Sequence, residues 1–225
     1  MITLSRLRVT VLAAAAGIVL AGCSGQQSES LRLLTQLPSA LAQSRAEPAQ
    51  VPADLIDQAL DFTDAPVAFL NFEQTGGQAL TQRIATNRGY QSFATAARQI
   101  ATLRQGAITS TRGFGGDMMS SDSDALLALL ASRQTGTAPY TMRFLTVENL
   151  IESYEFVCSV TPGETMPRVA PRAIPASARV MTADCNNADL RVTSHYAVLP
   201  DGYVIAASQW MGPALGHVGV QTIRR

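Results

Sequence analysis

The chain has 225 residues, of which 47% are hydrophobic, and its 17 basic and 17 acidic side chains give a formal net charge of zero. This balance argues against a nucleic-acid-binding protein, which uses an excess of positive charge to neutralise phosphates. The length is enough for one domain with a complete hydrophobic core.

The N-terminal residues have the pattern of a bacterial lipoprotein signal. Two arginines precede an uncharged apolar run, Val9–Leu20, which is shorter than the roughly 20 residues that a membrane-spanning helix needs. The run ends in Leu-Ala-Gly-Cys at positions 20–23, which has the form of a lipobox, the site where a precursor is acylated and cleaved. We therefore predict a signal peptide over residues 1–22 and a covalent lipid, including palmitate, on Cys23. An ordinary signal peptide that is cleaved elsewhere is the alternative.

A lipid on Cys23 implies a compartment outside the cytoplasm, with the membrane as the first partner. Ser24 follows the cysteine, where an aspartate would favour the inner membrane, so we expect an outer-membrane protein that faces the periplasm. The remaining pair, Cys158 and Cys185, is predicted to form a disulfide in that oxidising compartment, and a free reactive thiol is the alternative. With two histidines and no Cys-x-x-Cys sequence, we expect no metal site and no cofactor.

Residues 23–51 are predicted to be a lipid-anchored tether, because they are rich in Ser, Gln, Ala and Pro. Leucines between positions 31 and 41 predict one short amphipathic helix, broken at Pro38. This helix either packs on the domain or lies against the membrane, and its low positive charge favours the first.

Residues 52–225 are predicted to form a single, mostly β domain. A helix is expected from Pro52, and short apolar runs separated by glycine turns follow at regular spacing. Such spacing is typical of an antiparallel meander, here forming a curved sheet or an open barrel with two or three short helices. The expected strands are 67–72, 80–86, 90–95, 100–104, 107–111, 140–144, 154–160, 178–183, 192–198, 203–211 and 218–223.

A second helix is expected after the glycine-rich segment near the middle of the chain. Ser121 and Asp124 have the spacing of a capping box, in which each side chain bonds to a backbone N–H at the start of a helix. Gly136 is expected to end this helix, and the proline-rich stretch 161–175 is expected to be a loop.

The glycine-rich segment has two interpretations. Gly113, Gly115 and Gly116 either supply positive φ angles for a tight turn, or expose N–H groups that bind an anion together with Arg112. The anion would be a uronic acid or a phosphate of an exported glycan. Asp117 in the same segment is more often a turn former than an acid catalyst.

Trp210 is the remaining candidate for ligand binding, since an indole stacks on sugar rings, although a single tryptophan is more often part of a core. His195 is expected on a solvated strand face and His217 in a structural role. No nucleophile elbow, zinc-protease helix or phosphate-binding loop is present in the sequence, so we expect no enzyme.

Three blocks of sequence resemble a known family. The run Ile108–Ser120, with Thr-Arg-Gly-Phe-Gly-Gly-Asp at its centre, resembles the corresponding segment of YjbF-type lipoproteins, the group 4 capsule polysaccharide lipoprotein family that includes GfcB. Further similarity lies in Tyr154–Cys158 with Cys185 and strand 192–198, and in the run Ser208–Pro213 with the tail 216–223. The resemblance covers roughly residues 50–225, and the stretch 161–175 departs from it.

The resemblance implies a mostly antiparallel β fold and a role in capsule or exopolysaccharide production at the membrane. It transfers no catalytic residue. The function expected from it is non-catalytic support of polysaccharide export or assembly, through binding of surface polysaccharide or of an export-machinery protein. The alternatives are a periplasmic carrier of an acyl chain or lipoprotein in an open barrel, and a glycan-modifying enzyme with paired carboxylates.

Overall fold

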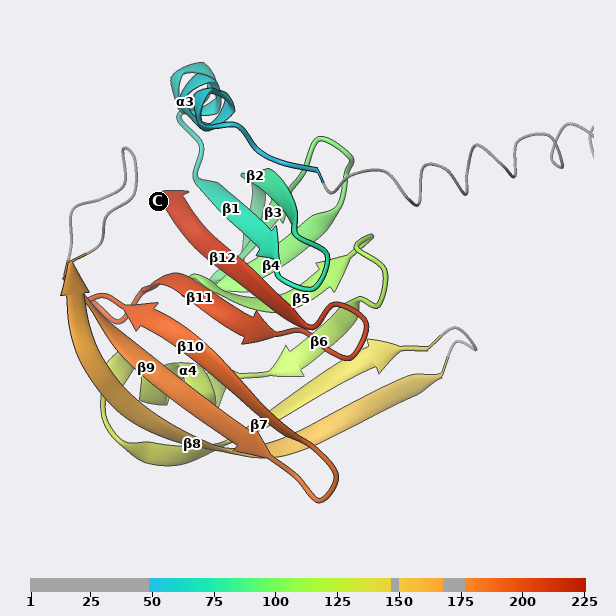
Figure 1. Cartoon of the computed structure of the whole chain (residues 1–225), viewed down its shortest axis with the longest axis vertical. Coiled ribbons are helices and arrows are strands. Elements are labelled where there is room, and N and C mark those ends of the chain that lie inside the picture. The colour runs from blue at the N-terminus through green and yellow to red at the C-terminus, as the bar shows by residue number, and fades with distance from the viewer. Residues whose placement is uncertain (1–48, 147–149, 168–176) are drawn as a thin grey trace, which may run out of the picture. The chain divides into compact units, whose positions relative to one another are not determined.

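Twelve antiparallel strands form one sheet in the computed structural model, which describes residues 49–146, 150–167 and 177–225 (Figure 1). The strands are β1 Val67–Phe72, β2 Gly77–Asn87, β3 Tyr90–Ala94, β4 Ile100–Arg104, β5 Ala107–Arg112, β6 Met118–Asp122, β7 Gly136–Leu145, β8 Ile151–Pro167, β9 Ser177–Asn186, β10 Arg191–Val198, β11 Val204–Trp210 and β12 His217–Arg224. The mostly β, antiparallel fold is therefore confirmed. The predicted signal peptide, Cys23 and the leucine-rich helix lie outside the described residues.

The order of the strands explains how the sheet curves. It runs β5-β4-β3-β2-β1-β12-β11-β10-β9-β8-β7-β6. Strands that are consecutive in the chain are therefore neighbours in the sheet, except that β5 and β6 form its two ends and β1 pairs with β12. The two ends of the sheet, β5 and β6, are consecutive in the chain and lie side by side (Figure 1). The sheet therefore bends into a nearly closed barrel.

We call the meeting of β5 and β6 the seam. At the seam, hydrogen bonds between side-chain hydroxyls and backbone groups take the place of backbone–backbone hydrogen bonds. The hydroxyl oxygen of Thr111 accepts a hydrogen bond from the N–H of Met118 at 3.0 Å, and the hydroxyl of Ser121 donates to the carbonyl of Thr109 at 3.0 Å. Edge strands expose unpaired backbone groups, and these bonds satisfy part of that potential.

Side chains fill the interior of the barrel, and one buried glutamine crosses it. The side-chain oxygen of Gln209, on β11, accepts from the N–H of Ile108 at 2.7 Å, and its NH₂ donates to the carbonyl of Ile108 at 3.3 Å. The backbone N–H of Val204 also donates to the carbonyl of Gln105. The largest fully buried side chains of the domain are Phe93, Leu70, Leu103, Ile108, Met118, Leu126, Leu130, Met142, Met181, Ile205, Met211 and Val67.

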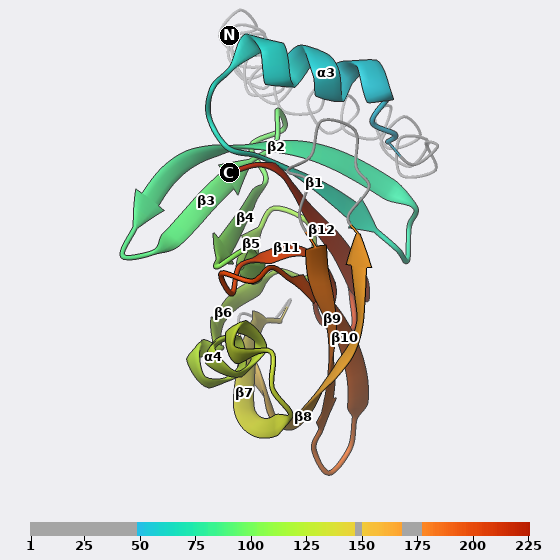
Figure 2. The same ribbon diagram turned by 90° about the vertical axis from the view of Figure 1, so that its left-hand side faces the viewer.

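Two helices accompany the sheet in the described residues. Helix α3, Ala53–Phe62, begins after Pro52 as expected and lies across the part of the sheet formed by β1 and β2 (Figure 2). The guanidinium of Arg224 holds its end, because it donates to the carbonyls of Leu60, Thr63 and Ala65.

Helix α4, Asp124–Ser132, corrects two predictions. No capping box forms, since Ser121 belongs to β6 and the N-cap residue is Ser123, whose side chain makes no capping bond. Gly136 does not end the helix, which stops at Ser132 with Arg133 in the left-handed conformation, and Gly136 instead begins β7.

The prediction of a loop over residues 161–175 is wrong for residues 161–167, which belong to a strand. Strand β8 continues to Pro167 and pairs with β9, with a register shift between Pro162 and Thr165 that accommodates the prolines. Residues 168–176 lie outside the described residues. Further along the same pair, Cys158 and Cys185 face each other in register and form the predicted disulfide.

Candidate functional site

The glycine-rich loop, residues 113–117, connects β5 to β6 at the seam. Its conformation is stabilised by hydrogen bonds to the side chain of Asp117. The carboxylate of Asp117 accepts hydrogen bonds from the N–H groups of Gly113, at 2.6 Å, and Phe114, at 3.1 Å. Gly113, Gly115 and Gly116 all have positive φ angles, as a tight turn requires. Two of the N–H groups that anion binding would use are thus already bonded. The side chain of Arg112 is exposed at the end of β5.

The loop also packs against the turn between β11 and β12. A Cβ on Gly116 would lie 2.2 Å from the Cβ of Ala214, so the loop approaches this turn as closely as a glycine permits. The ring of Phe114 packs against Phe72 with centroids 5.2 Å apart. These contacts give the loop a structural role at the seam.

Trp210 lies at the end of β11, in a cluster of aromatic side chains. Its ring meets those of Phe144, Tyr154 and Phe156 edge to face, with centroid distances of 6.3, 5.6 and 6.0 Å. Edge-to-face contacts of this kind stabilise a core. Trp210 is half-buried, so part of its surface still reaches solvent, and stacking on a sugar stays a prediction.

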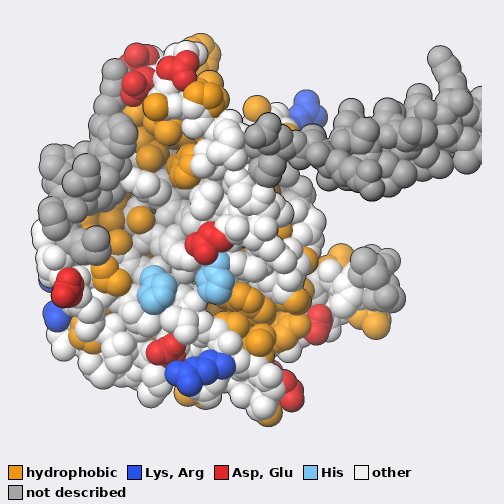
Figure 3. Space-filling model, viewed as in Figure 1, with side chains coloured by type: hydrophobic (Ala, Val, Ile, Leu, Met, Phe, Trp, Pro, Cys, Tyr) orange, Lys and Arg blue, Asp and Glu red, His pale blue; other side chains and the backbone are white. Residues whose placement is uncertain are grey.

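The two histidines of the chain lie close together on one face of the molecule (Figure 3). His195 is exposed, and its Nδ1 lies 3.2 Å from the hydroxyl of Thr182. The Nε2 of His217 lies 2.7 Å from the carbonyl of Thr193, which fits a structural role. In the part of the chain that the structure describes, no group of three or more His, Cys, Asp or Glu is placed to hold a metal ion.

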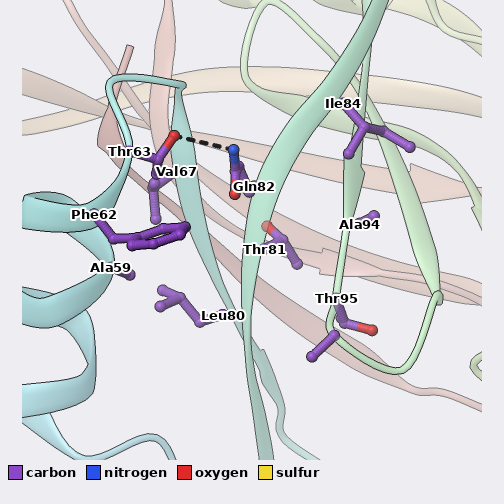
Figure 4. A pocket seen from close by; sticks show the side chains of 11 residues that line it. Ala59, Phe62, Thr63, Val67, Leu80, Thr81, Gln82, Ile84, Ala94 and Thr95 are labelled. Carbon is purple, nitrogen blue, oxygen red and sulfur yellow. Dashed lines mark hydrogen bonds between the residues drawn. The ribbon is translucent and has the colours of Figure 1, made fainter.

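An apolar cavity of about 330 Å³ lies between α3 and the sheet. Phe62, from α3, and Leu80, from β2, extend into it, and Gln82 donates a hydrogen bond to the hydroxyl of Thr63 at its rim (Figure 4). Its lining includes no charged side chain. This cavity therefore offers hydrophobic contact but no acid, base or ion.

A larger and more polar cavity of about 520 Å³ lies beside the seam. We call it the polar cavity. Tyr90 comes from β3, on one side of the seam, and the other residues come from β6, α4 and β7, on the other side. Its lining residues are Tyr90, Ser121, Asp122, Asp124, Ala125, Pro139 and Thr141.

Each aspartate of the polar cavity forms an ion pair with an arginine next to it. Asp122 bonds to Arg143 at 2.6 Å, and Asp124 bonds to Arg104, which crosses from β4 to the start of α4. Both carboxylates are more than two-thirds exposed, at 68% and 71% of their side-chain surface. The hydrogen bond from Arg143 holds the pKa of Asp122 below its ordinary value, so this carboxylate stays ionised.

Tyr90 completes the wall of the cavity. Its hydroxyl accepts a hydrogen bond from Arg104 at 2.9 Å, and the guanidinium lies 4.9 Å from the centroid of its ring. Arg104 therefore contacts both Tyr90 and Asp124 and fixes the two side chains relative to each other. The lining thus presents two carboxylates, a phenol and the hydroxyls of Ser121 and Thr141, and the two arginines that pair with the carboxylates lie outside the lining.

Sequence reasoning missed this cavity. Asp124 was assigned to a helix cap, and β6 was not predicted, so nothing placed Asp122 beside Tyr90 or Arg143. The only available signal was the density of Ser and Asp at 120–124, which also fits a turn.

Comparison of the sequence with protein-family profiles identifies the class of protein, which is a family of lipoproteins. The sequence profile of a family described as "Group 4 capsule polysaccharide lipoprotein gfcB, YjbF" matches residues 34–223. The chain therefore belongs to the YjbF/GfcB family, as the resemblance of its sequence blocks predicted.

A solved structure has a similar fold. The hypothetical lipoprotein YmcC from Escherichia coli (K12) superimposes with a TM-score of 0.61 at 11% sequence identity, over 79% of this chain and 98% of YmcC. A search of curated protein sequences finds no match. In the described residues, no helix is long and apolar enough to cross a membrane.

Proposed function

We propose that this protein is a non-catalytic, lipid-anchored component of capsule or exopolysaccharide production, which supports export or assembly by binding the glycan or an export protein. The observation that carries the proposal is the family match over residues 34–223, since the family is one of capsule polysaccharide lipoproteins. The lipobox at 20–23 and Ser24 support an anchor on Cys23 in the outer membrane, with the domain facing the periplasm.

The packing of the barrel favours this proposal over a carrier of acyl chains. A carrier holds its cargo in an open interior. Here a large cluster of buried side chains, among them Phe93, Leu103 and Met142, occupies the space that the sheet encloses. Gln209 also crosses that space to reach Ile108.

The carboxylates of the polar cavity favour binding over hydrolysis. A glycosidase needs one carboxylic acid with a raised pKa that donates a proton to the leaving oxygen. Arg143 lowers the pKa of Asp122 instead, and Asp124 is paired with Arg104 in an open, solvated position. Both aspartates thus fit a role as fixed hydrogen-bond acceptors.

Deletion of the gene tests the proposal. We expect cells without the protein to lose surface polysaccharide under conditions where neighbouring genes for polysaccharide production are expressed, and the wild-type gene to restore it. A Cys23→Ser gene should restore less, because the protein would no longer be held at the membrane. Unchanged surface polysaccharide in the deletion strain would contradict the proposal.

A further inference from the structure

We infer that the polar cavity binds an uncharged, hydroxyl-bearing segment of a glycan, an inference that rests on the proposed role in polysaccharide production and names the chemistry of the contact. The cavity volume of about 520 Å³ lies within the range of roughly 300–1,000 Å³ that is typical of small-ligand sites. The inference depends on how donors and acceptors alternate around the cavity.

Each aspartate that lines the cavity can accept a hydrogen bond from a hydroxyl group. In both Asp–Arg pairs one carboxylate oxygen is bonded to the arginine, and in the described residues the other oxygen makes no hydrogen bond. A sugar hydroxyl donates one hydrogen bond and accepts others, so it can donate to that oxygen while it accepts from the hydroxyl of Tyr90 or Thr141, which also line the cavity. Two such carboxylates at one cavity fit two hydroxyls of the same sugar or of adjacent sugars.

The charges of the cavity disfavour an acidic group. Asp122 and Asp124 offset Arg143 and Arg104 one for one, so the site has no net positive charge. A uronate or phosphate only accepts hydrogen bonds, and it would approach two ionised carboxylates that are largely exposed. An uncharged segment avoids this repulsion.

Hydrogen bonds and ion pairs also position the side chains of the cavity in the absence of a ligand. Arg104 joins Tyr90 to Asp124 across the seam, and Arg143 joins β7 to Asp122 on β6. Binding therefore orders few side chains, which lowers its entropic cost.

Calorimetric titration of the full-length protein in detergent tests this inference. The probe is a set of oligosaccharides from mild hydrolysis of the extracellular polysaccharide of the same cells. They are used as isolated and after reduction of their uronic carboxyls to alcohols. We expect both preparations to bind, and reduction to leave the affinity unchanged or higher.

Two variant pairs locate the binding. Ala125 is exposed on α4 within the cavity and Ala128 is exposed on α4 outside its lining, so Ala125→Trp should abolish binding and Ala128→Trp should not. Asp122→Asn should weaken binding about tenfold, the loss of one charged hydrogen bond. Asp201→Asn, which removes a similarly exposed Asp–Arg pair elsewhere, should have no effect. Thermal unfolding monitored by circular dichroism checks that each variant folds.

Three results would overturn the inference: no binding of either preparation, binding that is lost on carboxyl reduction, or binding that Ala125→Trp leaves intact. If any of these occurred while the deletion strain still lacked surface polysaccharide, the inference would fail and the proposed function would stand.

Discussion

Asp117 follows a glycine-rich segment and Asp124 a serine-rich one, and the two carboxylates make different kinds of contact. The carboxylate of Asp117 turns back onto the N–H groups of its own loop. The carboxylate of Asp124, at the start of α4, pairs with Arg104, twenty residues away on β4. The first contact joins residues no more than four positions apart, so it agrees with the prediction that Asp117 forms a turn. The second contact requires the fold.

Two adjacent glycines in the same loop allow a matched test of its packing. Gly116→Ala should destabilise the protein by about 3 kcal/mol, because positive φ disfavours alanine and the new Cβ would meet Ala214. Gly115→Ala should cost only about 1 kcal/mol, since that position has positive φ but open space around it. Urea unfolding measures both values. Equal losses would show that the loop does not pack on Ala214.

At the scale of elements, alternating apolar residues were enough to predict most strands. In β10, buried Ser194, Tyr196 and Val198 alternate with less buried neighbours, as a strand with one buried face requires. Strand β6 was missed because its Ser- and Asp-rich sequence also matches a helix start. The end of β8 was missed because Pro162 and Gly163 are typical of loops, whereas here they sit at a register shift.

The attachment of the edge strand β5 to β11, across the curved sheet that the sequence did predict, had no signal in the sequence. It depends on side chains that bond to backbone groups far along the chain, such as Gln209 to Ile108, which are 101 residues apart. No local pattern predicts which polar side chain will face an edge strand inside a barrel.

Gln209→Leu tests how far β5 depends on its contact with β11. The substitution leaves the buried N–H and carbonyl of Ile108 without their partner, so we expect a loss of about 2–4 kcal/mol in the free energy of unfolding. Gln58→Leu, at an exposed position of α3, is the control and should change stability by less than about 0.5 kcal/mol. A loss as small as that in the Gln209 variant would mean that β5 does not depend on this contact.

At the scale of the whole molecule, the filled barrel predicts how the protein responds to high pH. Burial raises the pKa of Tyr196 to about 12, and it also raises the pKa of Tyr140. A raised pKa means that folding favours the protonated phenol. The resulting stability is fully present below the unfolded-state pKa of about 10 and is lost as the pH rises toward 12.

We therefore expect the ultraviolet absorbance of tyrosinate to rise in two stages. The more accessible phenols of the five tyrosines should ionise first, and the buried ones only together with the loss of circular dichroism at higher pH. Ionisation of all five near pH 10 with the fold intact would contradict a packed interior.

The proposed role of this YjbF/GfcB family member in surface polysaccharide depends on the polar cavity beside the seam. The most direct test is the amount of surface polysaccharide in a deletion strain that carries the wild-type, Ala125→Trp or Ala128→Trp gene at equal protein levels. We predict that the wild-type and Ala128→Trp genes restore the polysaccharide and that Ala125→Trp does not. Full restoration by Ala125→Trp would contradict the claim.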